Sequence, residues 1–201
     1  MEDKSDIKIL REFAKSTNRA IVVRELPYPK SGIGIIQKMK RTVYVPNNPE
    51  KKSFFLWFND PYYKIGQTTV FSGAFIPISS RIKSKLNIRK RNILDKLKIL
   101  SKTKTIKIGN DYFDSRVVIS GDLDMESKRF LSQSRIQKQI LKALKIESNT
   151  LISINEYKID FVPELNHSPY LSIINRYGWD IDKNIIEIIF NQIEKIRDVI
   201  N

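Results

Sequence analysis

Cysteine is missing from the sequence, and histidine occurs only once. Without cysteine the chain can form no disulfide, no thiolate metal site and no cysteine nucleophile. The single histidine, His167, lies in a loop between Pro163 and Pro169. Because zinc and other transition-metal sites need several histidine, cysteine or carboxylate ligands, we interpret His167 as a structural or exposed residue. The sequence therefore predicts no metal centre and no cofactor.

Glycine is scarce, and long apolar runs are missing. The pair Gly32 and Gly34 is only a fragment of a phosphate-binding loop, so we interpret it as a turn before a strand. No apolar run reaches the roughly 18 residues of a transmembrane helix, and the longest runs, residues 54–58 and 185–190, suit core segments. The first residues are acidic and lack the apolar stretch of a signal peptide. We therefore expect a soluble, cytoplasmic protein.

The composition favours a folded chain. Hydrophobic residues make up 41% of the 201 residues and aromatic residues 10%, which is enough for a packed core. The length suits one globular unit, residues 1–201, with a division into two lobes as an alternative. The first lobe would be residues 1–80, a helix plus a β-meander. A basic connecting segment, residues 81–104, would join it to residues 105–201, which hold strands, a hairpin and helices.

Short apolar stretches separated by turn residues predict an antiparallel sheet in the N-terminal part. Phe54, Leu56 and Phe58 alternate with Phe55 and Trp57, which we interpret as a strand buried on both faces. The alternative is a stacking surface for unpaired bases. We expect a helix at residues 6–15, strands at 20–23, 33–37, 42–45, 53–58 and 68–76, and a break at residues 26–29. Gly73 would be either a bulge or a point of close backbone approach.

The C-terminal part mixes strands and helices. Asp122, Asp124 and Glu126 offer carboxylate oxygens that suit Mg²⁺ or Ca²⁺, but the rest of a calcium loop is missing, so we interpret them as helix-capping residues. We expect strands at residues 105–108 and 113–119, a short helix ending near Leu131, a second helix capped by Ser132 or Ser134, a hairpin of 151–154 with 157–162, and helices at 168–178 and 182–200. The predicted fold class is α+β, with antiparallel sheets (a meander plus a hairpin) and flanking helices.

Positive charge is concentrated in one segment. The chain has 36 basic and 22 acidic residues, a net charge of +14, and residues 81–107 contain eleven of the basic residues but one acid, Asp95. The apolar spacing predicts an extended piece and then a helix over residues 87–100. Such a segment would attract phosphates, and the alternative is an ordinary solvated surface. The candidate polyanion-binding residues are Arg81, Lys83, Lys85, Arg89, Lys90, Arg91, Lys96 and Lys98.

One stretch has a familiar pattern. Residues 105–122 read Thr-Ile-Lys-Ile-Gly-Asn-Asp-Tyr-Phe-Asp-Ser-Arg-Val-Val-Ile-Ser-Gly-Asp, and residues 130–136 read Phe-Leu-Ser-Gln-Ser-Arg-Ile before the expected hairpin. Over residues 104–163 this succession resembles a widespread group of uncharacterised bacterial domains. In that group a strand leads to a Phe-Asp pair, here Phe113-Asp114, and a second strand ends in aspartate. The resemblance implies an α+β domain and no catalytic residue, and the membrane-spanning segments of some members have no counterpart here.

Three functions remain open. We predict a non-catalytic binding or interaction module with a basic face for an anionic partner, which would be nucleic acid, an anionic membrane surface or an acidic protein. The first alternative is a metal-dependent nuclease, in which Glu156 would bind the metal, Lys158 would position a water and Asp60, Asp111 or Asp114 would add an acid. The second alternative is a structural subunit of an assembly, which a large exposed apolar patch would indicate.

Overall fold

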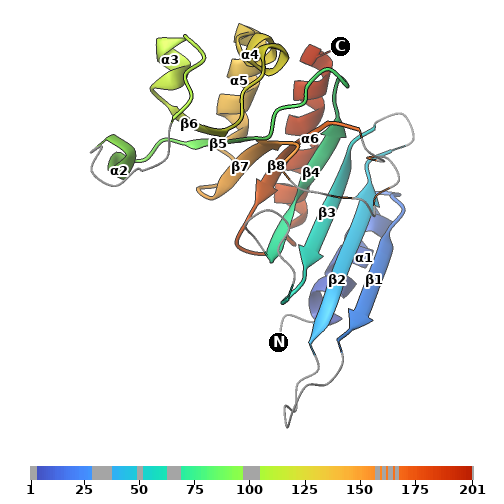
Figure 1. Cartoon of the computed structure of the whole chain (residues 1–201). Helices are drawn as coiled ribbons and strands as arrows, with labels where there is room; N and C mark the ends of the chain where they lie inside the picture. The colour runs from blue at the N-terminus through green and yellow to red at the C-terminus, as the bar shows by residue number, and fades with distance from the viewer. Residues whose placement is uncertain are drawn as a thin grey trace.

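A computed structural model describes residues 4–28, 38–48, 52–62, 69–96, 105–156, 159, 162, 165 and 168–200. Its central feature is an eight-stranded sheet whose neighbouring strands are antiparallel (Figure 1). The predicted α+β class, with antiparallel strands and flanking helices, is confirmed. In spatial order the strands are β1 (Val22–Pro27), β2 (Met39–Pro46), β3 (Phe54–Asn59), β4 (Val70–Pro77), β8 (Tyr170–Asn175), β7 (Thr150–Ile154), β5 (Leu86–Lys90) and β6 (Val117–Gly121).

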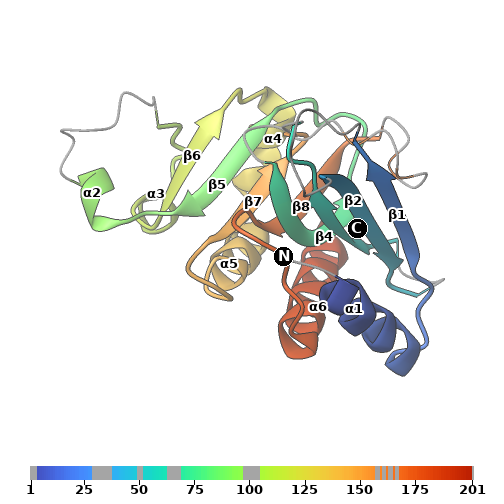
Figure 2. The ribbon, with the colours of Figure 1, turned by 90° about the horizontal axis from the view of Figure 1, so that it is seen from below.

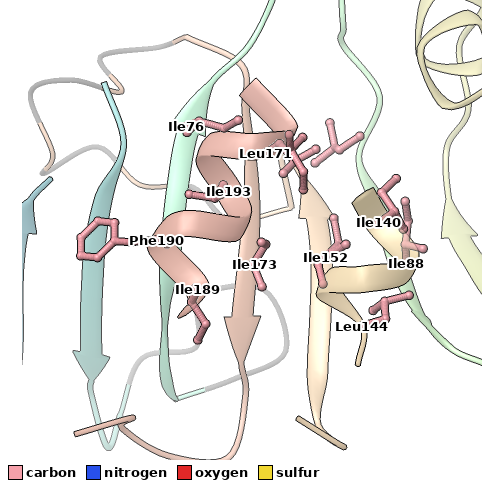
Figure 3. Packing of buried hydrophobic residues seen from close by; sticks show 14 of the residues in the cluster. Ile76, Ile88, Ile140, Leu144, Ile152, Leu171, Ile173, Ile189, Phe190 and Ile193 are labelled. Atoms are coloured by element: carbon pink, nitrogen blue, oxygen red, sulfur yellow. The ribbon is translucent and has the colours of Figure 1, made fainter. Parts of the chain in front are cut away.

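The long helices cover one face of this sheet, as Figure 2 shows for α1, α5 and α6. In Figure 3, Ile189 and Ile193 of α6 lie against Ile173 of β8, and Ile140 of α5 lies near Ile152 of β7. All five side chains belong to the same buried cluster, so the helices and the sheet share one core. The helices are α1 (Lys4–Ser16), α2 (Ile93–Lys96), α3 (Asp111–Asp114), α4 (Met125–Leu131), α5 (Ser134–Ala143) and α6 (Lys183–Ile200).

Strand β3 is buried on both faces, as its alternation predicts. Phe55 and Trp57 belong to the core under the helices, whereas Phe54, Leu56 and Phe58 belong to a second core on the opposite face. All five side chains have 0% relative exposure. They are therefore packing residues, and the alternative of a stacking surface for bases is wrong for this strand.

Gly73 lies where two strands approach closely, which confirms one of the two alternatives predicted from sequence. In β4 it faces Ile174 of β8. A Cβ atom at this position would lie 2.3 Å from the carbonyl oxygen of Ile173 and 2.6 Å from Cγ2 of Ile174. The absence of a side chain thus allows β4 to pair with β8, and this pair joins the N-terminal meander to the rest of the sheet.

Two predicted elements of the C-terminal part are wrong. The expected helix at residues 168–178 is instead β8, whose residues Tyr170 to Ile174 are all buried and which pairs on both sides. A proline can precede a strand as well as begin a helix, so Pro169 gave an ambiguous signal. The expected hairpin of residues 151–154 with 157–162 is also wrong, because β8 and β5 already occupy both edges of β7.

The described part of the basic segment, residues 81–96, contains a strand and one turn of helix. The predicted helix over residues 87–100 is wrong at its start, since residues up to Lys90 form β5 between β6 and β7. Leu86 and Ile88 are buried while Asn87 and Arg89 are partly exposed, which is the period of a strand. The division into lobes stays a prediction, although the sheet runs across it because β4 pairs with β8.

Smaller differences occur at the ends of elements. β1 continues to Pro27, beyond the predicted break, because it is an edge strand where a missing N–H is tolerated. Phe113 lies in α3 and not in a strand, since Asn110 caps this helical turn. The strand expected at residues 105–108 is reduced to a single β-bridge, between Ile106 and Ile119.

The predicted helix starts are partly confirmed. The Asp124 side chain accepts a hydrogen bond from the backbone N–H of Ser127 at 2.6 Å and caps α4, and Asp182 accepts one from Asn184 at 2.7 Å at the start of α6. The expected serine cap of α5 is wrong, because Gln133 holds that position without a capping hydrogen bond. No helix in the described part of the chain is long and apolar enough to cross a membrane.

Candidate anion-binding pocket

Three strands bring basic residues together at one end of the sheet. The last residues of β5 lie beside the first residues of β7, and Thr150 of β7 faces Asn175, the last residue of β8. The turns that follow or precede these strands therefore meet. They enclose a pocket of about 680 Å³. We call it the basic pocket; its lining residues are Arg89, Lys90, Arg91, Asn92, Ile93, Ser148, Asn149, Thr150, Arg176 and Tyr177.

One of the four cationic side chains in this lining is neutralised. Arg89 donates two hydrogen bonds to Asp95, at 2.7 and 2.5 Å. Asp95 is fixed further by Asn92, whose backbone N–H donates to the carboxylate at 2.8 Å. The hydrogen bond from Arg89 lowers the pKa of Asp95 to about 2, so this ion pair persists over the whole neutral range. Arg89 consequently contributes to the shape of the basic pocket but adds little to its net charge.

The other three cations, Lys90, Arg91 and Arg176, form no ion pair with a carboxylate among the described residues. Arg91 donates to two backbone carbonyl oxygens, those of Asp114 at 3.1 Å and Val117 at 2.9 Å, which position the guanidinium but do not neutralise it. The Nε atoms of Arg91 and Arg176 are buried and have no hydrogen-bond partner in the part of the chain that the structure describes. Buried donors without partners cost stability.

A second, smaller pocket continues the positive surface beyond Lys90 and Arg91. It has a volume of about 270 Å³, and Lys90 and Arg91 line both pockets. Arg116, which follows α3, and Lys145, which follows α5, supply two further cations. The basic surface therefore extends past the end of β5 in two directions.

A pair of carboxyl groups fixes the segments that line the basic pocket. Asn175, which precedes Arg176, donates through Nδ2 to Asp180 at 3.1 Å and to Glu147 at 3.3 Å. Burial, followed by the nearby negative charge of Asp180, raises the pKa of Glu147. Burial also raises the pKa of Asp180, against the hydrogen bonds from Asn175 and Ser72. The folded protein thus holds a proton at this pair more tightly than the unfolded chain does.

This pair gives a testable pH dependence. Folding raises the pKa of Glu147 above the roughly 4.3 of an unfolded chain. The stability that the protonated carboxyl group contributes is therefore complete below the unfolded pKa and is lost as the pH rises through the folded pKa. We expect Glu147→Gln to gain melting temperature relative to the wild type between pH 4.5 and 7.5. Glu12→Gln, a change at an exposed glutamate of α1, is the matched control and should show no such trend in thermal melts. Equal behaviour of the two variants would contradict the burial of this charge.

The structure brings together only part of the predicted polyanion-binding set. Arg89, Lys90 and Arg91 line the basic pocket. The members that precede β5 are exposed at its opposite end, where the backbone N–H of one of them, Lys83, donates to Asp124 at 3.0 Å. These preceding members are Arg81, Lys83 and Lys85. The side chain of Lys96 and the whole of Lys98 lie outside the described residues, as do His167, Gly32 and Gly34.

The sequence reasoning missed Arg176 and Tyr177. Both residues follow β8, which was expected to be a helix, so the turn that carries them was hidden. The available signal was the run of turn-forming residues 175–178, Asn-Arg-Tyr-Gly, after a β-branched apolar stretch.

The acidic residues of the nuclease hypothesis do not converge. Glu156 follows the end of β7, whereas Asp60 follows β3 at the opposite end of the sheet. Asp111 and Asp114 precede β6, whose first residue faces Lys90, so they also lie at that opposite end. No group of three His, Asp or Glu side chains within the described ranges could hold a metal ion. Lys158 is outside these ranges.

Fold and pocket together define an α+β protein with a basic pocket at one end of an antiparallel sheet. No family model, no curated protein and no solved structure matches the chain. The resemblance over residues 104–163 therefore stays a prediction.

Proposed function

We propose that this protein is a non-catalytic binding module that holds an anionic ligand in the basic pocket. The observation that carries this proposal is the convergence of Lys90, Arg91 and Arg176, none of which forms an ion pair with a carboxylate within the described ranges. Like charges gathered in a concave site repel one another and focus a positive potential, and an anion relieves both effects. A phosphate suits two guanidinium groups well, because each can donate two parallel hydrogen bonds to it.

Binding is favoured over catalysis by what lines the pocket. None of its ten lining residues is a carboxylate or a histidine. Two acids lie close in sequence to this lining. Asp95 is engaged by Arg89 and has a pKa of about 2, which makes it a poor base at neutral pH. Glu147, which precedes Ser148, accepts a hydrogen bond from Asn175 and does not line the pocket. The described lining thus offers hydrogen-bond donors and positive charge but no carboxylate or imidazole base of its own. A cytoplasmic location, where nucleic acids and other phosphate-bearing partners are abundant, belongs to the same proposal.

The alternative of a structural subunit gains no support from the surface. Most of the exposed large hydrophobic side chains in the described part of the chain lie on different elements, such as Leu26 on β1, Met125 on α4 and Ile188 on α6. Val22 shares β1 with Leu26, and Ile93 shares the basic pocket with Tyr177. Isolated exposed hydrophobic residues are normal for a soluble protein surface.

The proposal is tested by removing two charges from the pocket and, in a matched variant, two charges from elsewhere in the chain. Lys90→Gln/Arg176→Gln removes two charges from the pocket. Lys83→Gln/Lys85→Gln removes two charges from exposed residues at the opposite end of β5, so both variants lose the same net charge. The measurement is anisotropy titration with fluorescein-labelled heparin at several salt concentrations. We expect the plot of log binding constant against log salt concentration to become shallower for the pocket variant, by about 2 in the magnitude of its slope, one for each lost contact. The control should keep the wild-type slope.

Each outcome of this comparison decides the proposal. Equal losses in the two variants would show that the anion responds only to overall charge, and the pocket would then not be the site. Unchanged binding in both variants would contradict the proposal altogether. Thermal melts of both variants establish that they are folded before binding is compared.

A further inference from the structure

Resting on the proposed function, we infer that the ligand of the basic pocket is single-stranded nucleic acid, with Tyr177 as the surface on which an unpaired base stacks. Tyr177 follows Arg176 directly, lines the pocket and has 75% relative exposure. Its backbone N–H donates to Oδ1 of Asn175 at 3.1 Å, which fixes the turn and therefore the start of the side chain. A partly immobilised tyrosine beside an arginine matches the aromatic-plus-cation arrangement of proteins that bind single strands.

A second exposed apolar side chain lies on the same pocket. Ile93, the first residue of α2, has 76% relative exposure and also lines it. A purely anionic ligand such as a sulfated sugar or a polyphosphate would gain nothing from Ile93 and Tyr177. A nucleotide gains from both kinds of group, because its phosphate pairs with cations and its base is a flat, largely apolar ring.

Polar amides complete the match. Asn92 and Asn149 line the pocket and are exposed. Oδ1 of Asn92 accepts a hydrogen bond from the backbone N–H of Asp95 at 2.9 Å, so Asn92 offers chiefly its NH₂ donors, whereas the amide of Asn149 can both donate and accept. Such groups can satisfy the edge of an unpaired base, whatever its sequence. We therefore expect weak sequence preference and strong dependence on the phosphates.

A single strand fits this site better than a duplex does. In a duplex the base faces are stacked on one another and are not accessible to Tyr177, and sequence reading requires a helix or a pair of strands inside a groove. Among the described residues that line this pocket, only Ile93 belongs to a helix, the four-residue α2. The pocket is concave and has a volume of about 680 Å³, which lies in the size range of sites that enclose a small ligand.

The second pocket offers a path for the nucleic-acid strand beyond the basic pocket. Arg116 and Lys145 line it together with Lys90 and Arg91, which the two pockets share. A chain of nucleotides that leaves the basic pocket past Lys90 would meet these two cations next. The basic surface is thus long enough for more than one phosphate, as a single strand requires and a free phosphate ion does not.

The test compares oligonucleotides that share phosphates and differ in their bases. Labelled twelve-residue oligothymidine, an abasic oligomer of the same length and a duplex of the same length are titrated in anisotropy measurements at one salt concentration. We expect oligothymidine to bind at least about fivefold more tightly than the other two, since one base–aromatic stack contributes at least this factor. Tyr177→Ala should remove about this factor for oligothymidine and leave the abasic oligomer unchanged, while Tyr177→Phe should bind like the wild type.

The matched control is Tyr62→Ala, because Tyr62 has 56% relative exposure, lies after β3 and does not line either pocket. It should bind oligothymidine like the wild type. If Tyr177→Ala binds oligothymidine unchanged, or if the abasic oligomer or the duplex binds as tightly, the inference is wrong. If poly-glutamate competes as well as oligothymidine, the partner is an acidic protein and the inference is also wrong. In each of these cases the proposed function still stands when Lys90→Gln/Arg176→Gln weakens binding, and it fails separately when that variant has no effect.

Discussion

Replacing Gly73 by valine is expected to leave no cooperatively folded protein. The Cβ atom alone would lie 2.3 Å from the backbone oxygen of Ile173, closer than real Cβ contacts come, and the valine methyl groups would add to the overlap. Two of the three nearest atoms, the oxygen of Ile173 and Cα of Ile174, are backbone atoms of the central strand β8 and cannot rotate away as a flexible side chain could. We expect a loss of more than about 4 kcal/mol in the free energy of unfolding, which is exceptional for one residue.

The measurement is thermal unfolding followed by circular dichroism, with Gly178→Val as the control. No atom lies within 4 Å of the position of a Cβ at Gly178, so this substitution should leave the melting temperature nearly unchanged. The effect at Gly73 is large for a topological reason as well, because β4 and β8 form the one pair between the N-terminal meander and the rest of the described sheet. A Gly73→Val protein that melted within a few degrees of the wild type would contradict this strand pairing.

Trp57→Ala is expected to cause the second-largest loss. Trp57 has 0% relative exposure, its ring lies 4.3 Å from the ring of Phe55, and its Nε1–H donates to the backbone oxygen of Asp180 at 2.7 Å. Truncation of such a side chain leaves a large cavity and an unpaired carbonyl. We expect about 3 to 5 kcal/mol of lost stability, or a fall in melting temperature of about 6 to 20 °C for a chain of this size.

Trp57→Phe separates the two contributions of this residue. Phenylalanine keeps most of the apolar contacts but cannot donate the hydrogen bond to Asp180, so we expect a loss of about 1 to 2 kcal/mol in denaturant unfolding. Equal losses for Trp57→Ala and Trp57→Phe would show that packing around the ring contributes little, against the burial seen here. The hydrogen bond also links the core to the basic pocket, because Asp180 holds Asn175 and thereby the segment with Arg176.

Local periodicity was enough to predict the elements that have one clear buried face or two. The helical spacing of residues 6–15 predicted α1, and the apolar run at residues 53–58 predicted β3 with its two buried faces. Periodicity failed for β8. Its side chains are buried on both faces, Leu171 and Ile173 in the core under the helices and Tyr170 and Ile174 in the second core, and one of its partner strands, β4, is far away in sequence. A short apolar run of this kind does not distinguish a central strand from a buried helix.

For the same reason, the sequence predicted only some of the residues of the site. The charge density of residues 81–107 pointed to Arg89, Lys90 and Arg91, which lie in the basic pocket. Arg176 is a single cation in a nearly neutral region, and only the pairing of β7 with β8 brings it to the end of β5. The separation of Lys83 and Lys85 from the pocket likewise depends on β5 being a strand, whose two ends point to opposite edges of the sheet.

Amide chemical-shift mapping of the uniformly ¹⁵N-labelled protein during titration with oligothymidine tests the central claim most directly. If the basic pocket is the binding site, the largest shifts fall on residues 89–93, 148–150 and 176–177, which line it from three separate segments. Shifts that gather instead around Arg81, Lys83 and Lys85, or that spread evenly over the basic residues of the surface, would contradict it.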